Sequence, residues 1–97
     1  MVTDRGNYLM DLNEGGSNAK LELGCGPFPK REGFITTDVL DFDCVNLVGD
    51  VYEVLSKIND DSLNEVYACH FIEHIDDLTG FLDEVIRVCR DLSLIHI

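Results

Sequence analysis

Lys20-Leu21-Glu22-Leu23-Gly24-Cys25-Gly26-Pro27 is the stretch that decides the fold predicted for this 97-residue chain. It is typical of a short apolar strand that carries one acid, Glu22, and ends in a tight turn. Glycine at both Gly24 and Gly26 lets backbone N–H groups approach a ligand with no Cβ in the way. We therefore expect a ligand to bind at the end of this strand.

Strands and helices alternate after this turn. Residues 34–38 are β-branched and aromatic and end on Asp38, residues 46–50 end in Gly49-Asp50, and residues 64–69 have the pattern of a fourth strand. Residues 51–58 and 78–89 have the pattern of helices. In the second of these, apolar side chains recur at the helical period: Leu78, Phe81, Leu82, Val85, Ile86 and Cys89. The order predicts an α/β domain.

Asp38 is the first candidate for a specific contact. In a doubly wound fold, an acid at the end of the second strand can accept hydrogen bonds from both hydroxyls of a ribose. The fingerprint of a dinucleotide site also requires a third glycine, where this chain has Pro29, and an acid about 20 residues further on. Asp38 follows Gly26 by only 12 positions. The spacing therefore disfavours an NAD-dependent oxidoreductase, which stays an alternative.

The chain resembles the class I S-adenosylmethionine-dependent methyltransferases of type 11 over residues 20–90. The matching features are the acid-x-Gly-x-Gly turn, the acid of the second strand, the segment H-F-I-E-H-I at 70–75 and the helix end E-V-I-R-V-C-R at 84–90. The resemblance implies an incomplete Rossmann-like, doubly wound parallel sheet of strand order 3-2-1-4. It also implies a loop in place of the helix between the first two strands. The family continues with Pro-Gly-Gly and a fifth strand after the helix that follows strand four, and this chain departs from that pattern, so we expect a sheet truncated there.

The resemblance further implies S-adenosyl-L-methionine as the methyl donor and assigns residues to its parts. Asp50 has a second interpretation as the N-cap of the helix that begins at Val51, and the two roles are compatible. The implied contacts are Glu22, Gly24, Cys25 and Gly26 around the methionine moiety, Asp38 at the ribose, Asp50 and Val51 at the adenine, and Cys69 and His70 near the amino-acid part.

Catalysis of methyl transfer to oxygen or nitrogen needs a general base, and His70 is our candidate because a histidine titrates near neutral pH. We interpret His74 as a structural residue of the Glu-His turn. A divalent-metal site formed by His70, Glu73 and His74 is an open alternative, since all three side chains can ligate a metal. The acceptor implied by the resemblance is a small or sugar-like molecule, whose identity these residues do not specify.

Charge and composition restrict the partners. Seven Lys and Arg against 19 Asp and Glu give a net charge of −12, which disfavours nucleic acid. The four cysteines form no C-x-x-C pair, so we expect reduced thiols. We find neither a signal peptide nor an apolar run of the roughly 18 residues that a membrane span needs, and we predict a cytoplasmic location.

Three segments are expected along the chain: a loose lead-in at 1–19, a partial donor-binding domain at 20–91, and a tail at 92–97. Residues 92–97 (L-S-L-I-H-I) resemble the translation of a transposon end used in preparing DNA libraries. We therefore expect a non-native tail on an N-terminal methyltransferase fragment, itself inactive. The alternative is that these residues form a genuine edge strand. A non-catalytic descendant of the fold that binds a partner protein is the remaining functional alternative.

Overall fold

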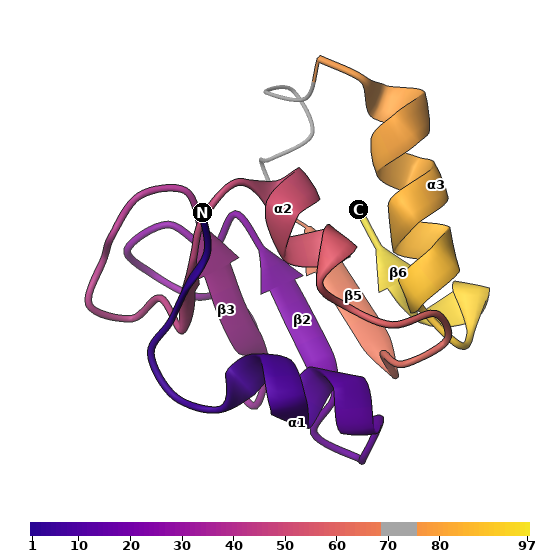
Figure 1. Cartoon of the computed structure of the whole chain (residues 1–97), viewed down its shortest axis with the longest axis horizontal. Helices are drawn as coiled ribbons and strands as arrows, with labels where there is room; N and C mark the ends of the chain where they lie inside the picture. The colour runs from indigo at the N-terminus through magenta and orange to yellow at the C-terminus, as the bar shows by residue number, and fades with distance from the viewer. Residues whose placement is uncertain (69–75) are drawn as a thin grey trace.

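A six-stranded sheet runs through the protein in the computed structural model, which describes residues 1–68 and 76–97 (Figure 1). Its strand order is β1-β4-β3-β2-β5-β6. The strands are β1 (Thr3–Asp4), β2 (Lys20–Leu23), β3 (Ile35–Asp38), β4 (Leu47–Val48), β5 (Glu65–Ala68) and β6 (Ile95–His96).

The sheet is mixed, because β1 pairs with β4 in the antiparallel direction while every other pairing is parallel. The prediction of a four-stranded, wholly parallel sheet in the order 3-2-1-4 is therefore wrong for the sheet as a whole. The four expected strands lie side by side in its middle as β4, β3, β2 and β5. The two outer strands have only two residues each, too few to produce a periodic pattern.

Both ends of the chain contribute to the sheet. Residues 1–19, expected to be a loose lead-in, form β1 and the helix α1 (Tyr8–Glu14), whose Leu12 is fully buried. The predicted tail forms a short 3₁₀ turn, η2 (Leu92–Leu94), and then β6, which pairs with β5 at Val66 and Tyr67. The expectation that the strand at 64–69 would be a sheet edge is therefore wrong. The non-native origin of residues 92–97 stays a prediction.

The helices α1, α2 (Val51–Ser56) and α3 (Leu78–Val88) contribute to one apolar core. Alternate strand residues, such as Leu21 and Leu23 of β2, face that core because side chains alternate across a strand. The connections from β2 to β3 and from β3 to β4 contain no helix. Among the described residues, the helices thus pack on one face of the sheet, not on both as a doubly wound fold requires.

The opposite face of the sheet is polar and is covered by a loop. Arg31 from that loop lies over the rings of Phe34 and Tyr67, at 5.3 and 5.1 Å from their centroids, and its guanidinium is 3.2 Å from a carboxylate oxygen of Glu65. Stacking of a guanidinium on aromatic rings is favourable where both are partly shielded from water. The loop therefore takes the place of a second helical layer.

Arg87, in the helix end that resembles the methyltransferases, has a structural role. Its guanidinium donates to the carbonyl oxygens of Leu55 and Ile58, both at 2.8–2.9 Å, and so binds the end of α2 to α3. Glu84 and Asp60 hold the guanidinium in place and raise its pKa through their hydrogen bonds. No helix in the described residues is long and apolar enough to cross a membrane.

Candidate functional site

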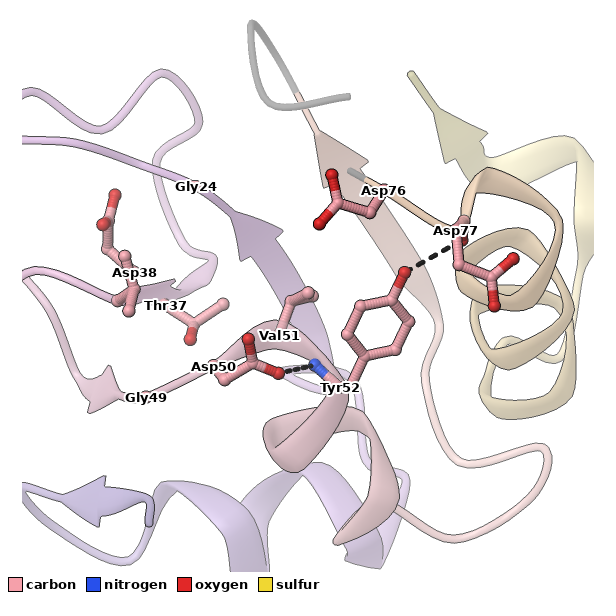
Figure 2. Close-up of a pocket in the computed structure, with 10 residues that line it drawn as sticks. Gly24, Thr37, Asp38, Gly49, Asp50, Val51, Tyr52, Asp76 and Asp77 are labelled. Atoms are coloured by element: carbon pink, nitrogen blue, oxygen red, sulfur yellow. Dashed lines mark hydrogen bonds between the residues drawn. The ribbon is translucent and has the colours of Figure 1, made fainter. Parts of the chain in front are cut away.

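A pocket of about 280 Å³ opens where β2, β3 and β4 end at their carboxyl termini (Figure 2). Ligands of open α/β sheets bind in this position, because the loops that follow parallel strands converge there. Ten residues line the pocket: Gly24, Thr37, Asp38, Val39, Gly49, Asp50, Val51, Tyr52, Asp76 and Asp77.

The glycine turn after β2 forms one wall of the pocket. Gly24 and Gly26 have φ angles of 63° and 64°, in the left-handed region that favours glycine. The Gly26 N–H donates to Asp38 Oδ2 at 2.8 Å, and the Leu40 N–H donates to Asp38 Oδ1 at 2.9 Å. Asp38 thus joins the turn after β2 to the loop after β3 while its side chain lines the pocket.

Asp50 caps α2, as predicted from the sequence. Its Oδ1 accepts a hydrogen bond of 2.9 Å from the Tyr52 N–H. The Gly49 N–H donates to the Asp38 carbonyl oxygen at 3.0 Å, which fixes the end of β4 beside that of β3. Asp50 is exposed and lines the pocket in addition to capping the helix. The cap uses one of its oxygens, so the other carboxylate oxygen can accept a hydrogen bond from a ligand.

Tyr52 connects α2 to the start of α3 across the pocket. Its hydroxyl donates to the Asp77 carbonyl oxygen at 2.8 Å (Figure 2). Desolvation and the nearby Asp77 carboxylate raise the pKa of the Tyr52 phenol, which therefore stays protonated at neutral pH. Asp77 also caps α3 by accepting from the Gly80 N–H at 3.0 Å.

The pocket is acidic. Four of its lining residues are aspartates and none is Lys, Arg or His among the described residues. Such a lining repels phosphate groups and attracts cations. The arrangement suits a neutral or positively charged ligand better than a dinucleotide, whose pyrophosphate is anionic.

Glu22 does not line the pocket, although the resemblance places it beside the methionine moiety. The side chain is buried, with 1% of its surface exposed. Its carboxylate accepts hydrogen bonds from the N–H groups of Lys30, at 2.9 and 3.2 Å, and Arg31, at 3.0 Å. Glu22 therefore holds the loop that covers the polar face of the sheet, and its contact with a donor stays a prediction.

Cys25 and Gly26 are likewise absent from the lining. The Cys25 thiol is buried, and burial raises its pKa to about 12, with further contributions from Cys44, Asp38 and Glu22. Such a thiol is almost wholly protonated at neutral pH, which makes it slow to attack a free oxidant and a poor metal ligand. Gly26 contributes through its backbone, which positions the turn.

The remaining predicted site residues, Cys69 and His70, lie outside the described residues, as do Glu73 and His74 of the alternative metal site. Within residues 1–68 and 76–97, no cluster of three or more potential ligands could hold a metal ion. The predicted roles of these four residues stay predictions.

Sequence reasoning missed several pocket residues: Thr37, Val39, Gly49, Tyr52, Asp76 and Asp77. Thr37 and Val39 flank the predicted Asp38, and Tyr52 directly follows the predicted Val51, so adjacency could have suggested all three. Asp76 and Asp77 directly precede the helix predicted at 78–89, where an aspartate indicates an N-cap rather than a ligand contact, and Asp77 does cap α3. No sequence signal indicates that α3 begins beside the end of β4.

Comparison with known proteins adds no assignment, since no family model, curated protein or solved structure matches the chain.

Proposed function

We propose that the pocket binds S-adenosylmethionine and that the protein is a methyltransferase. The observation that carries the proposal is the composition of the pocket: a left-handed glycine turn, an acid at the end of β3 and a Gly-Asp pair at the end of β4 around an acidic, phosphate-repelling space. The acceptor is a small or sugar-like molecule.

Asp38 is suited to a ribose. Each of its carboxylate oxygens accepts one backbone N–H and has a second lone pair that can accept a ligand hydroxyl. Because both oxygens are fixed by the backbone, the carboxylate is already oriented before a ligand arrives. Preorganisation of this kind lowers the entropic cost of binding.

The other end of the pocket is suited to a flat, uncharged base. Val51 and the Tyr52 ring give it apolar surface, and the Asp50 carboxylate can accept an exocyclic amine. The volume of about 280 Å³ is close to the lower end of the roughly 300–1,000 Å³ found for ligand pockets. That size fits the nucleoside part of the donor.

When bound, S-adenosylmethionine supplies a methyl group activated by a sulfonium ion. The four aspartates favour this cation, and the chain's own contribution is to hold the donor in one orientation. Removal of a proton from the acceptor is assigned to His70 as a prediction.

The proposal is tested by thermal unfolding with S-adenosylhomocysteine or NADH. We expect S-adenosylhomocysteine to stabilise the protein by about 2.7 kcal/mol at 100 times its Kd, and NADH to leave it unchanged. Asp38→Asn should weaken binding at least tenfold, since it removes about one hydrogen bond to a charged acceptor worth 1.5–3 kcal/mol.

Asp43→Asn is the matched control, because Asp43 is exposed in the same loop and does not line the pocket. It should bind like the wild type. Stabilisation by NADH alone would indicate an oxidoreductase instead. Stabilisation by neither ligand would favour a non-catalytic, partner-binding protein.

A further inference from the structure

Two cysteine thiols converge on one atom of the glycine turn. Cys25 Sγ donates to the Gly26 carbonyl oxygen at 3.3 Å, and Cys44 Sγ donates to the same oxygen at 3.2 Å. The Gly26 N–H is bound by Asp38. The Gly26 residue is therefore held on one side by a carboxylate and on the other by two thiols, from loops that are 18 positions apart in sequence.

We propose that Cys25 and Cys44 form a reversible disulfide when the protein meets a peroxide. Both thiols are free in the structure, they share one hydrogen-bond acceptor, and the Cys44 side chain also hydrogen-bonds to the Cys25 thiol. A disulfide brings the sulfurs to about 2.05 Å, which a modest shift of the loop that carries Cys44 would allow. No function is otherwise assigned to this pair.

Burial determines which thiol reacts first. Cys44 is half-buried, whereas Cys25 is buried and its pKa is raised to about 12. The thiolate is the nucleophile, so Cys44 attacks hydrogen peroxide first. Its sulfur bonds to one oxygen, the O–O bond breaks, and a sulfenic acid and one water form.

The second step closes the disulfide. Cys25 gives up its proton, its sulfur attacks the sulfenic sulfur, and hydroxide leaves and takes that proton as a second water. Two thiols are thus oxidised and one peroxide is reduced to two waters. The Gly26 oxygen loses both of its S–H donors, so oxidation changes the turn that forms a wall of the pocket.

Peptide mapping of the full chain tests the inference. Reduced protein is treated with hydrogen peroxide, blocked with N-ethylmaleimide, digested with trypsin and analysed by mass spectrometry. Cleavage after Lys and Arg separates Cys25 in residues 21–30 from Cys44 in residues 32–57. We expect these two peptides to be joined, with the loss of two hydrogen atoms, and to separate on treatment with dithiothreitol.

Three controls test whether the link is specific to this pair in the folded protein. Cys89→Ser should leave the link intact, since Cys89 is buried near Asp91 and apart from the turn, and Cys44→Ser should abolish it. The wild type in urea should give much less of the link than the native protein. A link from Cys25 to another cysteine, no link, or equal yields in urea and buffer would overturn the inference. It is independent of which ligand the pocket binds.

Discussion

Replacement of Glu22 by Gln is expected to destabilise the protein without adding or removing volume. The carboxylate accepts N–H groups from both Lys30 and Arg31, and the side chain is buried. Gln offers one acceptor oxygen, and its amide NH₂ would face the second N–H as donor against donor. The substitution therefore replaces the 2.9 Å hydrogen bond of the Lys30 N–H with a donor–donor contact and leaves that N–H only the 3.2 Å contact to the remaining oxygen.

The magnitude follows from these two effects. A hydrogen bond to a charged group contributes about 1.5–3 kcal/mol, and an unpaired buried donor costs about 1–3 kcal/mol. Because water can reach part of this loop, we expect a loss of about 2–3 kcal/mol in the free energy of unfolding. For a domain of this size each kcal/mol lowers the Tm by roughly 4–8 °C, so the Tm should fall by about 10–20 °C.

Urea unfolding followed by circular dichroism measures this loss. The control is Glu32→Gln, which makes the same change of charge at an exposed position of the same loop and should alter stability by less than about 0.5 kcal/mol. Equal stabilities of the two variants would refute the structural role of Glu22. In that case the acid would be free to contact a donor, as the resemblance implies.

Three further substitutions test other parts of the structure. Gly26→Ala should lower the free energy of unfolding in urea by about 1–2 kcal/mol. No atom lies within 4 Å of the added Cβ, but the φ of 64° strains any residue that has one. Gly16→Ala is the control and should cost little, because its Cβ would also meet no atom within 4 Å. Arg87→Met should cost about 2 kcal/mol by removing the bonds to the end of α2, and a loss below about 0.5 kcal/mol would contradict that role. The pKa of Tyr52 is raised, so in a spectrophotometric titration at alkaline pH one tyrosine of the wild type should titrate above the ordinary range. Tyr52→Phe should lack that transition. The native state holds the Tyr52 phenol proton more tightly than the unfolded chain does. The contribution of this proton to the free energy of unfolding is therefore present below pH 10 and is lost as the pH rises above it. Loss of a tyrosine that titrates in the ordinary range instead would show that the phenol is not held by Asp77.

The middle of the sheet could be predicted from sequence because β2, β3 and β4 end at or directly before Gly or Asp residues and β5 follows a predicted helix. β1 could not, because two residues have no period and their pairing depends on neighbours far away in sequence, whereas β6 lies in the segment 92–97 for which an edge strand was the alternative. The covering of the polar face by a loop could not be predicted from the sequence either. It depends on Arg31 reaching Phe34 and Tyr67 in three dimensions.

Three of the pocket residues could be predicted because they follow predicted strands. Asp38, Asp50 and Val51 lie at strand ends, and the carboxyl ends of parallel strands meet at one edge of the sheet. Glu22 lies between Leu21 and Leu23, which face the helical core, so its side chain faces the covered side of the sheet, two positions before the Gly24 that lines the pocket. The approach of Asp77 to Tyr52 comes from the packing of α3 against α2, which no local pattern encodes.

The central claim, that the pocket binds a cationic nucleoside donor, is tested most directly by a two-dimensional ¹H–¹⁵N NMR titration with S-adenosylmethionine. We predict saturable shifts of the amide signals of Gly24, Gly49, Val51 and Tyr52, with little change at Arg31 and Glu65 on the covered face of the sheet. The absence of saturable shifts, or shifts centred on Arg31 and Glu65, would contradict the account.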